Sequence, residues 1–586
     1  MTERRALLLV LLLLGAAAAL AILPGVFTID EDNYLAWVVS LRAGGLSLPG
    51  TGGLPWSPEL LFFDPAASVR TPGAIASVVP PLYALFAMPF SVLGFFGLAL
   101  PNLAAWLVTT ALVYRSARRL GTSQAAAWIG ALAFALAGFS VEYAVGVWPH
   151  SLSACLCFAA FVTAQRAADK GRTGWAWLAG LLAGLAAGVR YQNAVMAGMI
   201  GLVLLATSVR RFRSAIGFGL GIFLPVSIST VANGLRAGIW HPFSKGRGYA
   251  SVAGLAASVS PWDPFRSAIG RVVDFSIYPQ NALWTDMGAR YGQSGALLLL
   301  SAVKKALLQS APWMLVITAA ACLSWSGWSR REAKDSSRTT ARSIAFIIAG
   351  MVVLFGLAGT GRQEGWSHSQ RYLFDLVPFA ALMVAILVDR FGLHWKEVAL
   401  GGGAGGLLAA IPLSFSPASL TRQWSLLRVP LVLALLATLL WLAARRWTLF
   451  RRPAAWGLGA CLGWAAVVHL GDDLPAARAM REMNYSRLQA VETLLPKCRA
   501  ALFAFKAAPL GPLLLDRDVV LADTAIDDGR DADMLVEAFQ RAGRRVFAVL
   551  PTMPETHRQA LLHGRRISPV GSVDSLFVEI GPRLSP

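Results

Sequence analysis

The chain has 586 residues, of which 56% are hydrophobic and only 14% are charged, and its mean hydropathy is +0.57. A soluble globular domain carries roughly 25% charged residues, so the composition excludes a soluble protein and indicates an integral membrane protein. The net charge is +20, yet from Gly471 onward 15 basic residues balance 15 acidic ones. The excess of basic residues therefore belongs to the membrane part. There it indicates anchoring of cytoplasmic loops and, on the outer face, phosphate binding, and it does not indicate a nucleic-acid partner.

The amino terminus carries basic residues and then an apolar run over residues 6–29. This run has about 24 residues, more than the roughly 20 that a helix needs to span a membrane. A cleavable signal peptide is the alternative, because the alanine-rich stretch over residues 16–21 resembles a cleavage site. We expect an uncleaved first span.

Long uncharged stretches separated by basic clusters predict 13 transmembrane helices. With this number of crossings and the amino terminus in the cytoplasm, every multi-basic cluster lies on the cytoplasmic side, as the positive-inside rule requires. The protein is then a multi-pass protein of the cytoplasmic (inner) membrane, with its amino terminus in the cytoplasm and its carboxyl terminus outside. The predicted spans are residues 6–28, 97–114, 120–141, 150–165, 173–189, 191–209, 214–234, 306–328, 343–360, 373–388, 398–416, 429–444 and 453–470.

The uncharged stretch over residues 71–114 is long enough for two spans, but two crossings would invert every later loop. We therefore expect one crossing, preceded by an amphipathic helix over residues 77–93 that lies on the outer face and contains three prolines. Two large outer loops, about 30–94 and about 235–305, would form the roof of a cavity.

Beyond Gly471 the pattern changes to short β-rich runs that alternate with helical stretches. The predicted fold is thus an all-α polytopic membrane domain over residues 1–470 and a small extracytoplasmic α/β domain over residues 471–586. The strands are expected at residues 500–505, 519–522, 546–550 and 576–580, and the helices at 531–542 and 555–563. No phosphate-binding glycine motif occurs in this part.

Three acids, Asp30, Glu31 and Asp32, follow the first span and are followed by Tyr34. Acids beside a membrane helix are costly unless they are hydrated, paired or bound to something, so they mark a candidate site. A carboxylate there would act as the general base for a hydroxyl acceptor. The structural alternative is a hydrated cap with acids in the first turn of the next helix.

Six cations fall on outer loops and break the positive-inside trend. Arg190 is the most informative, because it lies between two spans joined by almost no loop, where a cation needs an anionic partner. A lipid phosphate suits a guanidinium well, whereas a structural carboxylate or snorkelling to the interface is the alternative. As a group these cations indicate an anionic lipid headgroup: Arg70, Arg190, Lys245, Arg247, Arg362 and Arg371.

His150 and His368 also fall on outer loops, and Tyr372 flanks Arg371. An isolated interfacial histidine is more often a hydrogen-bonding group than a metal ligand, and the seven histidines show no metal-binding spacing. We therefore predict no metal site, with a divalent ion near the three acids as the weaker alternative. Tyr372 is either part of the aromatic belt or a contact for sugar and phosphate.

With these residues in view, the chain resembles the C-type glycosyltransferase superfamily, in the branch of lipid A aminoarabinose transferase and the protein O-mannosyltransferases. The motifs that carry the resemblance are Asp30-Glu31 with Tyr34, the Pro-Pro-Leu-Tyr run that ends at Tyr83, and the basic end of the second span at residues 114–120. The layout of 13 spans with an outer terminal domain is also similar. The match is good over the first 230 residues or so and weak around Arg371.

The resemblance implies that Asp30 is the essential carboxylate that activates the acceptor and that Glu31 supports it. It also implies that Arg190 stands where the family places a basic residue against the donor phosphate. The chain departs from the pattern of the family at two positions. Val79 replaces the basic residue that precedes Pro-Pro in aminoarabinose transferases, and Asp32 adds a third acid.

The expected function is transfer of a sugar, with inversion, from a polyprenyl phosphate to an extracytoplasmic lipid, glycan or protein. Asp30 and Glu31 are the expected catalytic residues. The expected substrate-binding residues are Asp32, Tyr34, Arg70, Tyr83, His150, Arg190, His368, Arg371 and Tyr372. Two rivals stay open: a transporter or lipid flippase, and a polysaccharide polymerase or ligase that uses polyprenyl diphosphates. The spans are nearly free of charge, and this favours surface chemistry over transport.

Overall fold

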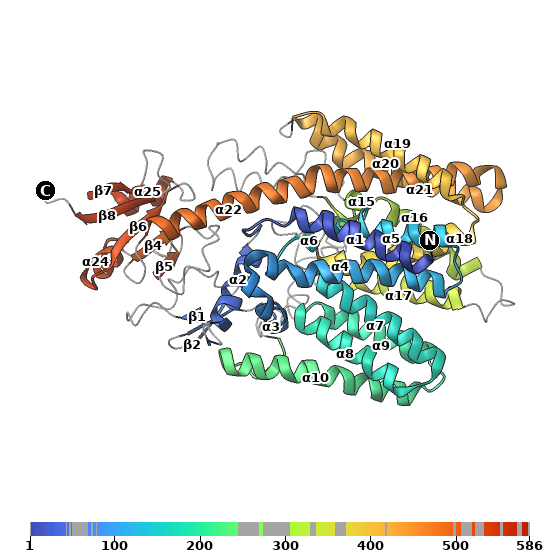
Figure 1. Ribbon diagram of the computed structural model, residues 1–586, viewed down its shortest axis with the longest axis horizontal. Coiled ribbons are helices and arrows are strands. Elements are labelled where there is room, and N and C mark those ends of the chain that lie inside the picture. Colours follow the sequence, from blue (N-terminus) through green and yellow to red (C-terminus); the bar gives the residue numbers. More distant parts are fainter. Residues whose placement is uncertain are drawn as a thin grey trace.

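In a computed structural model of the chain, a bundle of helices is joined to two small sheets (Figure 1). The structure describes residues 2–27, 29–42, 44–45, 48–49, 68–71, 74–77, 79–243, 269–273, 305–327, 336–357, 371–416, 419–495, 500–504, 518–521, 532–550, 555–570 and 577–583.

The apolar runs form helices where the hydropathy pattern predicts them, and each of the predicted spans overlaps a described helix. The first half of the bundle contains α1 (Glu3–Ala21), α2 (Ile29–Arg42), α3 (Pro81–Ala87), α4 (Gly94–Arg119), α5 (Gln124–Ala135), α6 (Ser140–Ala144), α7 (His150–Lys170), α8 (Thr173–Val189), α9 (Asn193–Thr207) and α10 (Arg211–Ala237). The second half contains α15 (Leu307–Ser310), α16 (Trp313–Gly327), α17 (Ser336–Leu357), α18 (Val377–Arg390), α19 (Trp395–Leu413), α20 (Leu420–Arg446), α21 (Arg451–Val468) and α22 (Leu474–Leu494).

Eight helical segments of the described chain are long and apolar enough to cross a membrane. They are Glu3–Ala21, Pro81–Arg119, His150–Lys170, Arg211–Arg236, Ser337–Leu354, Arg371–Arg390, Leu420–Arg446 and Thr448–Ser486. The helices α5, α8 and α9 are apolar but shorter. The chain is thus a multispanning helical membrane protein, and the count of 13 crossings stays a prediction.

The segment before the second predicted span is helical, as expected. Pro80 is the N-cap of α3 and Pro81 is its first residue, where a proline loses no hydrogen bond. A 3₁₀ helix over Met88–Leu93 follows and leads into α4.

Helix α18 is buried within the bundle along most of its length. Its residues from Val377 to Val388 are all buried, which matches an element that is apolar on every side. A short 3₁₀ helix over Arg371–Leu376 precedes it and brings Arg371 and Tyr372 to the start of this buried helix.

Glycines allow α19 and α21 to pack with their backbones in close approach. A Cβ at Gly405 would lie 2.1 Å from the carbonyl oxygen of Ala460, and a Cβ at Gly463 would lie 1.9 Å from that of Gly402. Spacings of four residues, as in Gly401 to Gly405 and Gly459 to Gly463, place small residues on one face of a helix, and this is a common way to pack membrane helices.

Beyond residue 471 the structure differs in two respects from the sequence-based prediction, because the helix α22 and a strand over Arg565–Val570 were not predicted. Helix α22 continues from α21 through a π-helical turn over His469–Asp473 and runs from the bundle toward the terminal sheet (Figure 1). Strands begin only at residue 500. The sheet has the order β5-β4-β6-β8-β7, with β4 (Ala500–Ala504), β5 (Asp518–Leu521), β6 (Arg545–Val549), β7 (Arg565–Val570) and β8 (Phe577–Arg583).

Strand β4 pairs in parallel with β5 and β6, and β8 pairs antiparallel with β6 and β7. The predicted helices are present as α24 (Ala532–Arg541) and α25 (Glu555–Leu562), and together with the sheet they bury a small core around Phe503, Phe539 and Val546. A second sheet, of order β1-β3-β2, lies between α2 and α3 in the sequence: β1 (Leu48–Pro49), β2 (Ser68–Thr71) and β3 (Ala74–Ser77). Both sheets lie at the same end of the bundle as α2 (Figure 1).

Candidate functional site

The three acids lie in the first turn of α2, where carboxylates are favoured by the helix dipole. Glu31 is fully buried and forms a bidentate ion pair with Arg481 of α22, with Nη1–Oε2 and Nη2–Oε1 distances of 2.7 and 2.8 Å. The backbone N–H of Phe27 also donates to Oε2, at 2.5 Å. Glu31 therefore anchors α2 to α22. Asp30 and Asp32 are its neighbours on this turn, and their side chains lie outside the described part.

The loop between α6 and α7 packs directly against this ion pair. A Cβ at Gly146 would lie 2.4 Å from both Glu31 Oε1 and Arg481 Nη2, so a glycine is needed at this position. The side-chain amide of Asn102 fixes the loop by donating to the carbonyl oxygens of Gly146 and Trp148, at 2.9 and 2.7 Å. The loop thus connects the acids of α2 to Trp148.

Tyr34 and Tyr83 belong to the same region. The amide of Asn102 also lies 2.9 Å from the Tyr83 hydroxyl, to which it donates. The Tyr83 ring meets that of Tyr34 edge to face, with centroids 5.1 Å apart. Both tyrosines are buried, so they support the loop and the first turns of α2.

The structure shows which anionic group lies next to Arg190. Its side chain is buried, and Nη1 donates to Asp375 Oδ2 at 2.8 Å. The other oxygen of Asp375 accepts from the Ser153 hydroxyl at 2.7 Å. Nη2 of Arg190 lies 3.3 Å from the backbone oxygen of Arg371, to which it donates. Arg190 therefore pairs with a protein carboxylate and also holds the backbone that carries Arg371.

Arg371 lies among aromatic rings. Its guanidinium carbon is 5.0 Å from the centroid of Trp148 and 4.9 Å from that of Tyr372, and Nη2 donates to the Tyr372 hydroxyl at 3.0 Å. Such contacts hold a guanidinium in place.

His150 has the most unusual environment in this cluster. It is only 3% exposed, and neither ring nitrogen has a hydrogen-bond partner. The ring stacks on Tyr143 with centroids 4.6 Å apart and meets Trp148 edge to face at 4.7 Å. Unsatisfied polar atoms are costly in a buried place, so His150 has the features of a group that meets a ligand.

The structure thus brings together seven of the predicted site residues, all around the loop and the start of α7: Glu31, Tyr34, Tyr83, His150, Arg190, Arg371 and Tyr372. Arg70 lies on β2, and its side chain lies outside the described part, as does the whole of His368.

A second group of buried charges surrounds the π-helical turn. Asp473 accepts from Lys305 Nζ, and its other oxygen lies 2.7 Å from His469 Nδ1. Glu142 of α6 lies in the same electrostatic environment and is only 4% exposed, and neither of its oxygens has a hydrogen-bond partner. Burial, and after it the charge of Asp473, raises the pKa of the Glu142 carboxyl well above its usual value.

Asp375, Glu142 and Arg481 are not among the residues predicted from the sequence. A signal existed for Asp375, because it is an acid inside a predicted span. Glu142 directly follows another predicted span. Arg481 had no such signal, since its partner Glu31 is 450 residues away in the sequence. Within the described residues, no group of three His, Cys, Asp or Glu side chains is arranged to hold a metal ion.

The comparisons with known proteins agree with this architecture. The model of the family described as dolichyl-phosphate-mannose-protein mannosyltransferase matches residues 74–232. No curated protein matches the chain. The crystal structure of ArnT from Cupriavidus metallidurans in the apo state is similar, with a TM-score of 0.56, 13% identity, and coverage of 99% of this chain and 98% of that chain.

The crystal structure of the same ArnT bound to undecaprenyl phosphate has a TM-score of 0.50 and 14% identity, and covers 98% of this chain and 97% of that chain. At these identities the likeness concerns the fold. Taken with the family match over residues 74–232, it confirms the resemblance inferred from the sequence: the chain is similar to glycosyltransferases of the C-type superfamily, in the branch of ArnT and the protein mannosyltransferases.

Proposed function

We propose that the protein transfers a sugar from a polyprenyl phosphate to an acceptor outside the cytoplasm. The observation that carries this proposal is the cluster of Arg371, Tyr372, Trp148 and His150, which lies beside the acid-bearing turn of α2. It combines a cation for a phosphate, aromatic faces for a sugar ring, and an unsatisfied imidazole for a hydroxyl group. The ArnT structure bound to undecaprenyl phosphate supports the choice of donor class.

Arg371 is the residue that binds the donor phosphate in this proposal. The charge of Arg190 is offset by Asp375 at 2.8 Å, so its first role is to position the backbone of Arg371. Because charge on the leaving oxygen grows in the transition state, a fixed guanidinium stabilises the transition state more than the ground state. His150 hydrogen-bonds the sugar from the other side of Trp148.

Asp30 is the general base. It removes the proton of the acceptor hydroxyl as the oxygen attacks the anomeric carbon, the bond from that carbon to the phosphate oxygen breaks, and the polyprenyl phosphate leaves. A single displacement inverts the anomeric centre. Glu31 supports Asp30 indirectly, because its ion pair with Arg481 holds the turn of α2 in place.

In the proposed topology, the chain crosses the membrane 13 times, with the amino terminus in the cytoplasm and residues 471–586 outside. This places the cluster at the outer face, where lipid-linked donors are presented. Alkaline phosphatase fusions test it: a fusion after Pro586 should be active and one after Arg119 inactive. The reverse pattern would refute the topology.

Two rivals remain as alternatives. A transporter or flippase would move a lipid phosphate without consuming it, and it would use polar groups along its pathway. A polymerase or ligase would use a polyprenyl diphosphate and would need charge for a second phosphate.

Donor binding is tested by the melting temperature of the purified protein in detergent, with and without polyprenyl phosphate. A ligand that binds only the folded state raises this temperature. We expect a rise for the wild type and for Arg446→Gln, an exposed control at the end of α20, and no rise for Arg371→Gln. An equal rise in Arg371→Gln would remove the proposed role of this residue.

A further inference from the structure

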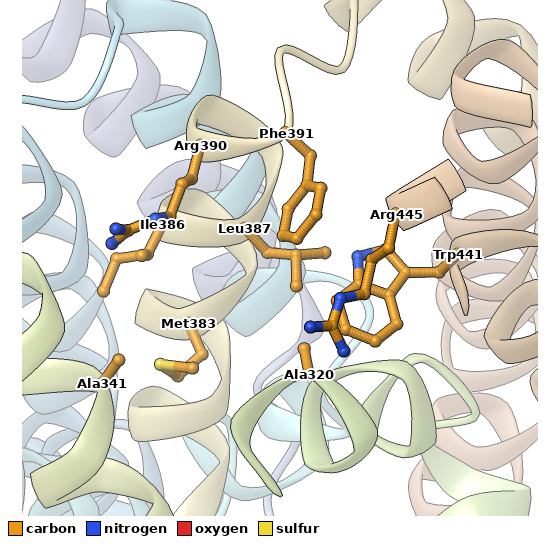
Figure 2. A pocket seen from close by; sticks show the side chains of 9 residues that line it. All are labelled: Ala320, Ala341, Met383, Ile386, Leu387, Arg390, Phe391, Trp441 and Arg445. Atoms are coloured by element: carbon orange, nitrogen blue, oxygen red, sulfur yellow. The ribbon is translucent and has the colours of Figure 1, made fainter. Parts of the chain in front are cut away.

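A separate cavity lies between α16, α17, α18 and α20, at the far end of α18 from the site. The empty space in it, counted together with the adjoining open solvent, is about 400 Å³, and Figure 2 shows the side chains that line it. Helix α18 has 14 residues, and with a rise of 1.5 Å per residue its two ends are about 20 Å apart. The proposed site lies at the first end and the cavity near the other. The proposed donor site therefore does not account for this cavity.

The cavity is amphipathic. Apolar side chains form most of its wall, among them Met383, Leu387 and Phe391 of α18 and the segment that follows it (Figure 2). Two arginines, Arg390 and Arg445, complete the lining and come from the last turns of α18 and α20. Hydrocarbon surface beside guanidinium groups is complementary to an anionic lipid rather than to a sugar or a metal ion.

Trp441 provides an independent observation. Its ring lines the cavity and is only 2% exposed, yet the indole N–H has no hydrogen-bond partner. An indole N–H that is buried nearly always finds an acceptor. The Arg445 guanidinium carbon lies 5.7 Å from the centroid of this ring, and the Phe391 ring meets it edge to face at 5.3 Å. An acceptor oxygen in the cavity would satisfy the indole next to a positive charge.

Charge in this region also favours an anion. Within the described part of the chain, no carboxylate forms an ion pair with Arg445. The adjoining segment carries three more arginines, Arg446, Arg451 and Arg452. Basic pockets between membrane helices bind the headgroups of anionic lipids.

We propose that this cavity is a binding site for an anionic membrane phospholipid. One acyl chain packs against Met383 and Leu387, and the phosphate accepts hydrogen bonds from Arg445 and from the Trp441 indole. The proposal does not depend on the proposed transferase function, since the cavity shares no residue with that site.

The test is the melting temperature of the purified full-length protein in a neutral detergent. The probes are dioctanoyl phosphatidylglycerol, dioctanoyl phosphatidylcholine and inorganic phosphate at equal concentrations. We expect phosphatidylglycerol to raise the melting temperature more than either of the others does. An equal rise with phosphatidylcholine would show a site for acyl chains only, and an equal rise with inorganic phosphate would show a site for free anions. Either result would overturn the proposal.

Variants link the effect to this cavity. Arg445→Gln should abolish the selective rise, and Trp441→Phe, which keeps an aromatic ring but removes the N–H, should reduce it. The matched control Arg446→Gln removes the same charge from the neighbouring residue, which does not line the cavity, and should retain the rise. Equal loss in Arg445→Gln and Arg446→Gln would show general charge attraction instead of a site and would refute the proposal.

Discussion

The ion pair between Arg190 and Asp375 permits a prediction that separates structure from chemistry. Replacing Arg190 by Met keeps much of the side chain's apolar length but leaves the carboxylate of Asp375 without its cation. Asp375 is completely buried and would retain only the hydrogen bond from Ser153. Removal of one partner of a buried ion pair costs about 3–5 kcal/mol, because the remaining charge stays uncompensated.

The double variant Arg190→Met/Asp375→Asn should recover most of this loss. Asparagine fits the space of aspartate and still accepts the hydrogen bond from Ser153, but it carries no charge. A double-mutant cycle should therefore give a coupling energy of at least about 2 kcal/mol between the two positions. The assay is thermal or denaturant unfolding of the four proteins in the same detergent.

The refuting result is specific. If Arg190→Met melts like the wild type, or if the double variant is no more stable than Arg190→Met, the ion pair does not stabilise the folded protein as inferred. Sugar transfer provides a second readout, for which we expect no recovery in the double variant, because Arg190 holds the backbone of Arg371. Recovery of transfer together with stability would show that this contact is dispensable.

Three further predictions concern other parts of the chain. Asp30→Asn should lower turnover by about 100-fold or more, the range for loss of a general base, while the melting temperature stays unchanged; wild-type turnover would exclude Asp30 as the base. Gly405→Ala should destabilise the protein by about 1–3 kcal/mol, because its Cβ meets a backbone oxygen at 2.1 Å, whereas the control Gly403→Ala has open space; equal melting of the two variants would contradict the inferred contact. Because the pKa of Glu142 is raised, the folded state binds a proton more tightly than the unfolded state does, and the stability of the protein should fall as pH rises from about 4.5 toward the raised pKa. The melting temperature of Glu142→Gln should therefore depend less steeply on pH between pH 5 and 8. A slope equal to that of the wild type would show that folding does not raise the pKa of Glu142.

The helices of the bundle could be predicted from long apolar runs. Inside a membrane no water satisfies the backbone N–H and C=O groups, so such a run forms a helix, in which these groups bond to one another. Helix α22 was missed, since it follows the bundle with a mixed polar composition and has no apolar run. Strand β7 was missed for another reason: it lies at the edge of its sheet and contains Pro569 and two arginines, which are typical of edge strands and obscure the alternating pattern.

The candidate site was found in part for a similar reason. Acids and arginines beside spans are expensive in a membrane, and that cost made Arg190 and the acids of α2 visible in the sequence. Their partners were not visible. Asp375 is 185 residues from Arg190 and Arg481 is 450 residues from Glu31, and only the folded chain shows that these pairs exist.

The most direct test of the proposed function measures transfer from the donor. Membranes that contain the protein are given polyprenyl-phosphate sugars, radiolabelled in the sugar and tested one at a time, with native membranes as the source of acceptor. We expect one donor to lose its label to another molecule with the wild type, and Arg371→Gln and Asp30→Asn to abolish that transfer while Arg446→Gln retains it. If the wild type consumes none of these donors, or if Arg371→Gln and Asp30→Asn transfer as well as the wild type, the assignment of this site to sugar transfer is wrong.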